Sequence, residues 1–381
     1  TKQISDAIGT KGQHAIIFGE RGVGKTSLAN LMRIFTSPNS NTAIVNCSDG
    51  DSFSNVWRKV FSELTIQQTK RNPGFNAGER ILTSSVADYL PDTVDPGIVR
   101  RILTQYTQDF PAVIIVDEFD RLKSAGSQHP FADTIKDLSD RSVNVTVILV
   151  GVARDVDELV QDHASIDRTL VQIKMPRMAA TELEELLTKA LGHPDLKMTI
   201  EPSARELIVM LSQGLPHYTH LLGKEAATSA IYGKSKAIES WHVELGIKKA
   251  LDKSKQSIGA TYQRATSSQR SDTLFESVLL ACDLAKVDEF GYFSSADVRT
   301  PLNRIAGKNY EIPNFSQHLD KFSSDTTRGP VLEKSGTSRR FKFRFINPIL
   351  QPYVIMKGLT EKKVDFDLIQ SLFHKRSAIF F

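Results

Sequence analysis

The sequence has few of the features that mark secreted or membrane proteins. Its two cysteines, Cys47 and Cys282, show neither pairing nor metal-binding spacing, which argues against a disulfide framework and indicates a reduced, cytoplasmic setting. Long apolar runs are also missing, because AVIIV and VTVILVGVA are far too short to span a bilayer. No basic, apolar leader opens the chain at Thr1, so we expect neither secretion nor a membrane partner.

The chain also lacks a strong charge of either sign. Its 381 residues include 48 Lys and Arg against 44 Asp and Glu, which gives a net charge of +4. That balance permits nucleic-acid binding without requiring it, so local clusters must decide. With 40% apolar and 24% charged residues, the composition is that of an ordinary globular protein. The length predicts two or three domains.

Short apolar runs alternate with helical patterns in the first half of the chain. Such continuous apolar runs are typical of a parallel sheet that helices cover on both faces, so we predict an α/β fold. The predicted strands are residues 15–18, 42–47, 112–117, 145–151 and 169–175. Residues 66–96 are rich in Gly, Pro, Asn and Thr. We predict a surface insertion there, either a plain loop or one that contacts DNA or a partner.

After Pro176 the strand pattern gives way to helical periodicity. A later group of three helical segments, followed by the hairpin pattern of VLEKSG and SRRFKFRFIN, is typical of a winged helix. The predicted domains are an α/β core (1–175), a helical lid (176–255), a linker helix or hinge (256–271), a winged-helix domain (272–358) and an unassigned C-terminal tail (359–381).

The stretch GERGVGKTS satisfies the P-loop pattern between a predicted strand and a predicted helix. Glycines let the backbone curl so that successive N–H groups face phosphates, and the helix start adds its positive dipole end. Lys25 is expected to reach the β- and γ-phosphates, and the Thr26 hydroxyl to ligate Mg²⁺. The predicted ATP-binding residues are Gly19, Glu20, Arg21, Gly22, Val23, Gly24, Lys25, Thr26 and Ser27.

A second motif, AVIIVDEFDRL, ends a predicted strand with two carboxylates. Asp117 lies at the carboxyl end of its strand, where α/β sheets bind ligands, and is expected to hold Mg²⁺. Glu118 is placed to orient or deprotonate the water that attacks ATP. The alternative is an acidic pair that merely ends a strand. Asp120 and Arg121 are predicted to be a solvated pair.

In its order of motifs the chain resembles the AAA+ superfamily. The order is a P-loop, a strand ending in NC, a strand ending in DE, a fourth strand, a helical lid and a winged helix. It is most similar to ATPases of the origin-recognition or initiator type, with bacterial relatives among transposition regulators and STAND switches. The resemblance implies slow, regulatory ATP hydrolysis with Mg²⁺ in a homo-oligomer.

The resemblance also implies roles for two residues outside the P-loop. Asn46, which ends a strand, matches the Asn that couples the catalytic glutamate to DNA or a partner. Its alternative role is to cap the strand end. Arg168 precedes the fifth strand of the core, where AAA+ proteins carry an arginine finger for a neighbour's γ-phosphate. Its alternative is a surface arginine in an acidic stretch.

Two features depart from the plain AAA+ pattern and are similar to STAND ATPases. The fourth strand ends in VARD, which makes Arg154 a candidate sensor of the γ-phosphate or else a partner of nearby aspartates. The lid contains GLP, in which Pro216 is expected to pack near the adenine. The alternative is that Pro216 only starts a helix, since proline is common in the first turn of any helix. The usual lid arginine is missing, and His217 or His220 could replace it.

The hairpin of the winged helix carries a basic face. In RRFKFRF, three phenylalanines alternate with cations, which places the rings on the core face and the charges outside. Such a strand suits phosphate contacts on double-stranded DNA. The predicted DNA-binding residues are Arg339, Arg340, Lys342 and Arg344, with Lys321 on the preceding helix. A protein-docking surface and a merely solvated face remain the alternatives.

Two functional hypotheses follow from these features. The first is an initiator-type ATPase that assembles as an oligomer on DNA, which Asn46 and the basic wing favour. The second is a STAND-like switch that oligomerises to activate an effector partner, which the VARD and GLP elements favour. Replication, transposition and antiviral defence all use such an architecture, so the pathway is left open.

Overall fold

The structure is a computed structural model that divides into two compact units, Thr1–Pro176 and Arg177–Phe381. No helix among the described residues is long and apolar enough to cross a bilayer. The described residues are 2–35, 40–71, 79–125, 128–153, 156, 159, 169–254, 257–268, 274–288, 290–337 and 340–377.

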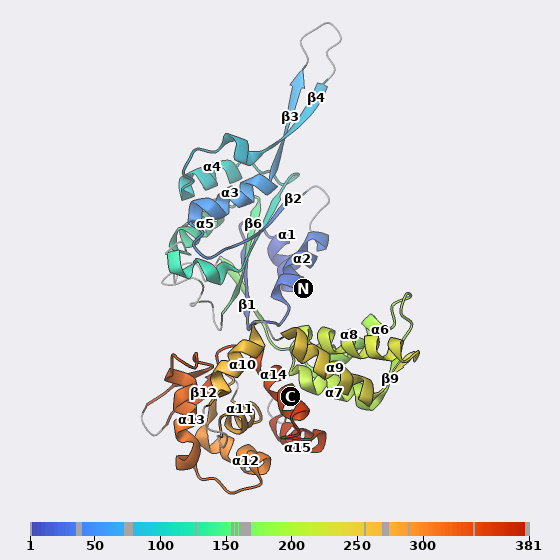
Figure 1. Ribbon diagram of the computed structural model, residues 1–381. Helices are drawn as coiled ribbons and strands as arrows, with labels where there is room; N and C mark the ends of the chain where they lie inside the picture. Colours follow the sequence, from blue (N-terminus) through green and yellow to red (C-terminus); the bar gives the residue numbers. More distant parts are fainter. Residues whose placement is uncertain are drawn as a thin grey trace. The chain divides into compact units, whose positions relative to one another are not determined.

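The first unit is built around a five-stranded sheet in the order β2-β5-β6-β1-β7 (Figure 1). All of its strand pairs are parallel. The strands are β1 (His14–Gly19), β2 (Asn41–Asn46), β5 (Ala112–Asp117), β6 (Val145–Val152) and β7 (Leu170–Met175). The predicted α/β fold with five parallel strands is therefore confirmed.

Helices cover both faces of this sheet, as continuous apolar strands require. Alternate residues of β1 show the two faces, because Ala15 and Ile17 belong to one buried core whereas Ile16 and Phe18 belong to the other. The first core is completed by α1 (Lys2–Gly9) and α2 (Lys25–Phe35). The second is completed by α3 (Phe53–Glu63), α4 (Pro96–Leu103) and α5 (Gln128–Asp140).

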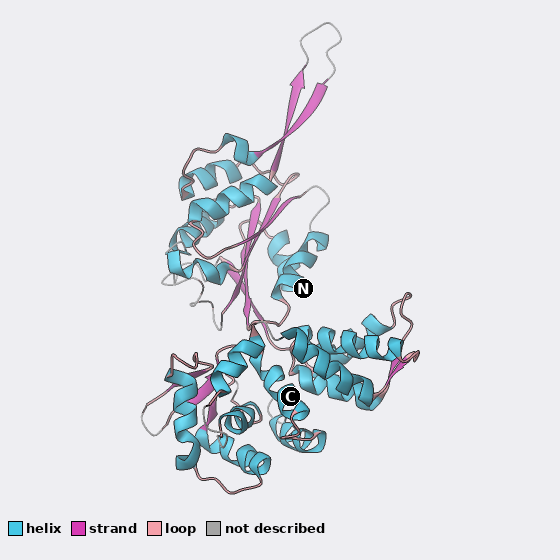
Figure 2. Ribbon diagram, viewed as in Figure 1, coloured by secondary structure: helices cyan, strands magenta, loops and turns pink. Residues whose placement is uncertain are grey.

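The predicted surface insertion contains regular structure rather than a plain loop. Strands β3 (Thr65–Arg71) and β4 (Glu79–Ser85) pair in antiparallel fashion and project from the body of the first unit (Figure 2). A 3-10 turn, η1 (Val86–Tyr89), follows. The loop prediction was wrong, because polar residues, QQTK in β3 and TSS in β4, interrupt the apolar alternation on which strand prediction depends.

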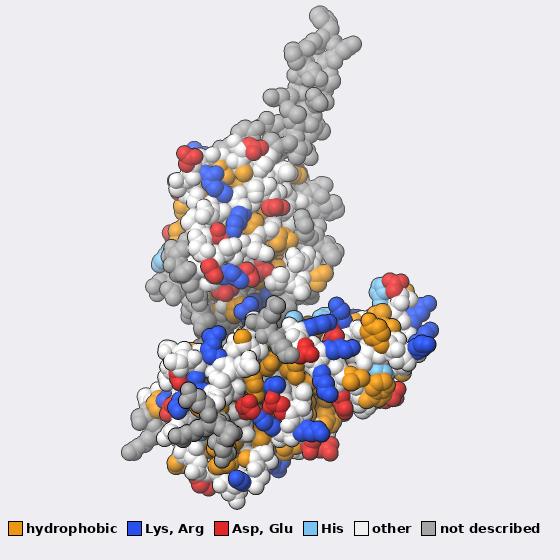
Figure 3. Space-filling view, viewed as in Figure 1, with side chains coloured by type: hydrophobic (Ala, Val, Ile, Leu, Met, Phe, Trp, Pro, Cys, Tyr) orange, Lys and Arg blue, Asp and Glu red, His pale blue; other side chains and the backbone are white. Residues whose placement is uncertain are grey.

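The second unit begins with the predicted helical lid. Its helices are α6 (Ala180–Leu191), α7 (Pro202–Ser212), α8 (Pro216–Tyr232) and α9 (Ser240–Lys253), with the short paired strands β8 (Thr199–Ile200) and β9 (Ala237–Ile238). One end of the lid exposes several large apolar side chains, visible as orange atoms in Figure 3. They are Leu196, Ile231, Tyr232, Trp241 and Leu245.

The rest of the second unit holds the three helices and the hairpin expected of a winged helix, with one strand that the sequence did not indicate. The elements are α10 (Ile258–Thr266), α11 (Phe275–Asp283), β10 (Phe293–Ser294), α12 (Ser295–Ala306), α13 (Ile312–Ser324), β11 (Leu332–Ser335) and β12 (Lys342–Phe345). The sheet order is β10-β12-β11. The end of the chain adds α14 (Leu350–Thr360) and α15 (Phe366–Ser377).

A buried polar network joins the lid to the winged helix within this unit. Asp283 of α11 is fully buried. Its carboxylate accepts hydrogen bonds from Gln213, at the end of α7, and from Gln351 of α14, both at 2.9 Å. Gln351 in turn accepts one from Arg177 at 2.6 Å. Since a buried carboxylate depends on its partners, these helices are held to one another.

Candidate active site

The P-loop connects β1 to α2 through a backbone that glycine permits. Gly22 and Gly24 have φ values of 90° and 98°, in the left-handed region that other residues rarely adopt. A Cβ on Gly19 would lie 2.4 Å from the carbonyl oxygen of Met175 in β7. The loop is thus seated against the neighbouring strand, and its shape follows from the glycine spacing.

Lys25 lies inside this loop. It is 7% exposed, and its Nζ donates hydrogen bonds to the carbonyl oxygens of Gly19 and Glu20 at 2.9 and 2.7 Å. Burial lowers the pKa of Lys25 to about 8, although the charges of Asp120 and Asp117 oppose that change. The two predicted motifs follow β1 and β5, two parallel strands of one sheet, and therefore lie at the same end of it.

Asp117 and Glu118 end β5 with different surroundings. Asp117 is 4% exposed, and one of its oxygens accepts a hydrogen bond from the Glu118 N–H at 2.8 Å. The Glu118 side chain is 44% exposed, and its φ of 56° places a non-glycine residue in the left-handed region. Such a conformation is costly, and residues that adopt it cluster at functional sites.

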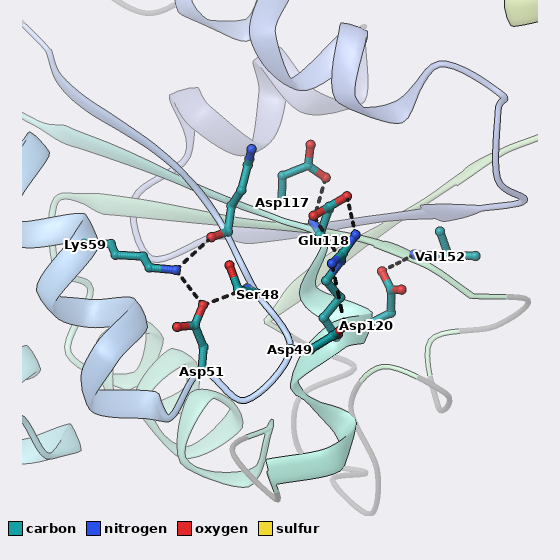
Figure 4. A network of polar contacts seen from close by, with 10 residues as sticks. Ser48, Asp49, Asp51, Lys59, Asp117, Glu118, Asp120 and Val152 are labelled. Atoms are coloured by element: carbon teal, nitrogen blue, oxygen red, sulfur yellow. Dashed lines mark hydrogen bonds and ion pairs between the residues drawn. The ribbon is translucent and has the colours of Figure 1, made fainter. Parts of the chain in front are cut away.

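The carboxylate of Glu118 is paired with Arg121 through two contacts (Figure 4). The guanidinium reaches its two oxygens at 3.0 and 3.3 Å. Asp120 instead accepts a hydrogen bond from the Val152 N–H at 2.8 Å. The predicted solvated pair of Asp120 and Arg121 was therefore wrong. The 3-10 turn η2 (Phe119–Ala125) aligns side chains three residues apart rather than adjacent ones.

Asn46 lies at the end of β2, directly opposite Asp117 in the parallel register. Its carbonyl oxygen accepts a hydrogen bond from Lys59 of α3 at 3.3 Å. Lys59 also binds Asp51 at 2.6 Å, which fixes the loop after β2 (Figure 4). Among the described residues, the Glu118 carboxylate bonds to Arg121 rather than to Asn46, so the coupling role of Asn46 stays a prediction.

The hydrogen bonds around Asp51 also explain its acidity. Burial alone would raise the pKa of Asp51. Hydrogen bonds from Lys59 and from the Ser48 N–H outweigh burial and lower that pKa. Asp51 therefore stays ionised and keeps the loop after β2 closed against α3.

The residues present fit a nucleotide with Mg²⁺. A buried lysine in a glycine-shaped loop suits phosphate oxygens, and α2 begins at this loop with its N–H groups free of helical partners. Thr26, exposed in the first turn of α2, and the buried Asp117 would hold Mg²⁺, which prefers oxygen ligands shared with phosphates. When bound, the ion would neutralise charge on the phosphates.

Three other predicted site residues are not part of the arrangement around the P-loop that the structure describes. Arg154 and Arg168 fall outside the described residues. Pro216 belongs to the second unit, where it is buried in the first turn of α8. Next to it, burial lowers the pKa of His217, with His220 adding to the effect. The roles predicted for all of these residues stay predictions.

Comparison with known families assigns the part of the chain that holds this site. A family model described as an AAA domain matches residues 9–160. That range contains both the P-loop and the Asp117–Glu118 pair. No curated protein matches the sequence.

Solved structures extend the likeness beyond the AAA domain. Over 97% of this chain and 91% of the other, the fold is similar to that of the Aeropyrum pernix ORC2 protein in its ADPNP–ADP complexes, with a TM-score of 0.51 and 12% identity. The A. pernix ORC1 protein in complex with DNA gives a TM-score of 0.46 at 13% identity, over 95% and 93% of the two chains. The first match confirms the predicted AAA+ fold of the origin-recognition type.

Outside the AAA domain, the predicted DNA-binding residues differ in how much they are paired. On β12, Lys342 binds Asp288 at 2.8 Å and Arg344 binds Glu333 at 2.9 Å. The hydrogen bond that Lys342 donates to Asp288 raises the pKa of Lys342. Arg340 and Lys321 are exposed. Arg339 lies outside the described residues.

The phenylalanine alternation of the wing is present in the structure. Phe343 and Phe345 are buried, whereas Phe341 is half-buried with Lys334 over its ring at 3.8 Å. The cations of β12 lie on the other face of the strand. Lys342 is exposed there, whereas the Arg344 side chain is only 12% exposed and lies over the Tyr292 ring at 4.5 Å. Because two of them already have carboxylate partners, Arg340 and Lys321 are the better candidates for contacts with phosphates.

The AAA domain also holds polar residues that sequence reasoning did not bring to the site. These are Arg121, which pairs with Glu118, and Asp49, whose carboxylate lies 3.8 Å from Arg121. The spacing of Glu118 and Arg121 within DEFDR was the available signal, since positions three apart face each other in a helical turn. The contact with Asp49 joins two segments far apart in sequence, and no local pattern indicates it.

Proposed function

We propose that this protein is an ATPase that binds ATP with Mg²⁺ and hydrolyses it. The observation that carries the proposal is the meeting of the buried Lys25 with the Asp117–Glu118 pair in one AAA domain. Lys25 is the only lysine of the P-loop and would contact the β- and γ-phosphates. A setting inside the cell follows from that use of ATP.

Each residue has a distinct part in the reaction. The P-loop N–H groups and Lys25 bind the phosphates and neutralise charge that develops on them. Glu118 accepts a proton from water while the water oxygen forms a bond to the γ-phosphorus. The bond from that phosphorus to the bridging oxygen breaks, and ADP leaves with the electron pair. Asp117 and Thr26 would hold Mg²⁺, which would supply positive charge next to the phosphates.

The proposal extends to assembly. We propose that the chain forms a homo-oligomer on double-stranded DNA and that hydrolysis is slow and resets the assembly. The exposed cations Arg340 and Lys321 on the winged helix support DNA contact, since phosphate contacts position a protein on a duplex. The exposed apolar end of the lid supports association, because such patches mark interaction surfaces.

A STAND-like signalling switch is the second candidate. Its support is the Asp283 network, which joins Gln213, immediately before the GLP motif, to α14. Because this network holds the lid and the winged helix together, a movement of the lid would also move the winged helix. In this case ATP would drive oligomerisation without DNA, and the output would be an effector protein that acts in replication, transposition or defence.

Turnover of ATP by purified protein tests the ATPase proposal. Glu118→Gln is expected to lower kcat by about 10²- to 10⁴-fold, because it removes a general base. Its affinity for ATP should stay close to that of the unaltered chain, whereas Lys25→Ala should lose ATP binding. Glu63→Gln, which changes an exposed carboxylate on α3, is the matched control. No turnover by the unaltered chain would refute the ATPase proposal, and equal, measurable turnover in Glu118→Gln would refute the role of Glu118.

A further inference from the structure

Asp120 joins two strand ends of the first unit through a hydrogen bond that regular strand pairing does not supply. The register between β5 and β6 ends at Val116 and Leu149, whereas β6 pairs with β1 as far as Val152. Past the end of β5, the Asp120 carboxylate accepts a hydrogen bond from the Val152 N–H at 2.8 Å (Figure 4). A side chain thus satisfies a strand N–H at the point where the neighbouring strand has ended.

The strand end that Asp120 holds lies beside the first residue of the P-loop. Val152 is opposite Gly19 in the parallel register of β6 and β1. On its other side, Gly19 is opposite Met175 of β7, so close that a Cβ on Gly19 would lie 2.4 Å from the Met175 carbonyl oxygen. Gly19 is therefore held between two strand ends, and Asp120 fixes the one on the β5 side.

The position of Gly19 bears directly on Lys25. The Lys25 Nζ donates a hydrogen bond to the Gly19 carbonyl oxygen at 2.9 Å. The lysine is thus oriented by the same residue that lies opposite Val152. A group that is ordered before its ligand arrives binds more tightly, because the cost of ordering it has already been met. Restraint of Gly19 should therefore favour the binding of phosphates by Lys25.

The fold leaves room for the contact of Asp120 at Gly151. A Cβ on Gly151 would lie 3.3 Å from both the main-chain nitrogen and the Oδ1 of Asp120, and 2.9 Å from the Cδ2 of Leu159. Glycine permits such a close approach because it has no side chain. The turn η2 can therefore approach β6 closely enough for Asp120 to reach Val152.

We propose that Asp120 is a positioning residue that holds the end of β6 against the P-loop and thereby places Lys25 for the phosphates of the nucleotide. The proposal rests on the ATPase function above and adds a residue that acts on the phosphates through the P-loop. Asp120 is half-buried and Val152 is exposed, so water can partly replace the hydrogen bond when it is lost. Its removal should therefore loosen the P-loop without unfolding the unit.

Calorimetric titration of ADP and steady-state hydrolysis of Mg²⁺–ATP by the full chain at pH 7 test this role. Asp120→Ala should weaken ADP binding and raise KM by the same factor, about three- to ten-fold, the range of a hydrogen bond that water partly replaces. The loss should appear in KM rather than in kcat, because the P-loop contacts phosphates both before and during the reaction. A merely structural role would reduce the fraction of folded protein, which lowers the apparent kcat and leaves KM unchanged.

Two further variants separate the hydrogen bond from charge and from stability. Asp120→Asn loses the charge but keeps an acceptor oxygen, so it should lose less affinity than Asp120→Ala. Burial lowers the pKa of Lys25, and the Asp120 charge opposes that change. Equal losses in the two variants would therefore assign the effect to charge and overturn the positioning role. Asp95→Ala is the matched control and should change neither KM nor ADP affinity, because the Asp95 carboxylate also accepts a main-chain hydrogen bond at 2.8 Å, from Ile98, but at the start of α4.

Failure of the inference can be told apart from failure of the ATPase proposal. If the unaltered chain binds ADP and hydrolyses ATP while Asp120→Ala matches it in KM and in ADP affinity, only the role of Asp120 is refuted. A fall in kcat at unchanged KM would also refute that role, since Asp120 would then act on Glu118 or on stability rather than on the P-loop. If the unaltered chain binds neither nucleotide, the ATPase proposal fails and the inference fails with it.

Discussion

At the scale of single residues, Lys25 gives the site a measurable dependence on pH. Its pKa is lowered to about 8 by burial, so the nucleotide-free protein loses this positive charge as the pH rises through 8. Bound phosphates favour the charged form. Affinity should therefore be constant below pH 8 and should weaken by about ten-fold for each pH unit above it. Calorimetric titration of ADP between pH 7 and 9.5 measures this slope.

The slope must belong to Lys25 itself. Lys25→Ala should bind ADP weakly and with no slope in this range, and Lys25→Arg, whose guanidinium stays charged, should also give a flat line. A flat profile for the unaltered chain would show that Lys25 remains fully charged in the free protein. A slope that persists in Lys25→Ala would assign the titration to another group.

Residue identities in the P-loop could be predicted because they follow from backbone geometry. Gly22 and Gly24 occupy positions where φ is positive, and Lys25 must follow them to face the phosphates. Arg121 could not be assigned in the same way. Its partner depends on a 3-10 turn and on Asp49 from another strand, and neither leaves a pattern in the sequence. Local backbone geometry can thus be predicted from the sequence, whereas contacts between segments far apart in the sequence cannot.

At the scale of elements, the same distinction applies. Strands β1, β5 and β6 were predicted because each is a continuous apolar run buried on both faces. The edge strands β2 and β7 are only partly buried and were predicted from shorter apolar runs. The hairpin of β3 and β4 and the short strand β10 were missed, because polar strands and two-residue strands carry little periodic signal. Helix α15 was left unassigned for a different reason. No recognisable motif near the end of the chain indicated which domain a helix there would belong to.

The Asp283 network predicts that helices of the lid and of the winged helix depend on one buried carboxylate. Asp283→Ala would leave the amide donors of Gln213 and Gln351 without their acceptor. Each unsatisfied buried donor costs about 1–3 kcal/mol, so we expect a loss of about 2–4 kcal/mol in the free energy of unfolding. Urea denaturation of the full chain, followed by circular dichroism, measures it.

Two variants test the cause of that loss. Asp283→Asn keeps one acceptor oxygen and should lose less stability than Asp283→Ala. Asp195→Ala, which removes a carboxylate that is 89% exposed in the lid, should change the free energy of unfolding by less than about 0.5 kcal/mol. Hydrogen exchange should rise in α7, α11 and α14 of Asp283→Ala and stay unchanged in α2. Unchanged exchange in α7 would mean that the network does not join these helices.

At the scale of the whole molecule, the open question is what drives assembly. An initiator-type ATPase needs both nucleotide and DNA, because its winged helix must contact phosphates. A signalling switch needs nucleotide alone. The unequal ion pairing of the winged-helix cations gives a way to decide, since Lys342 already has a carboxylate partner in Asp288, whereas Arg340 is exposed and Lys321 lies over the Phe275 ring at 5.6 Å. Replacing Lys342 should therefore reduce the affinity for DNA less than replacing Arg340 or Lys321.

Mass photometry of the full chain, with ADP or a non-hydrolysable ATP analogue and with or without duplex DNA, measures the requirement. We expect oligomers only when the ATP analogue and DNA are both present. Replacing Arg340 and Lys321 by Ala should abolish them and reduce the salt dependence of DNA binding by about two counterions, because each phosphate contact contributes a slope of about 0.9. Replacing Lys224 and Lys236 of the lid, a matched change in charge at exposed positions, should not. Oligomers that form with the analogue alone would instead identify a switch, whose effector is then the partner to seek.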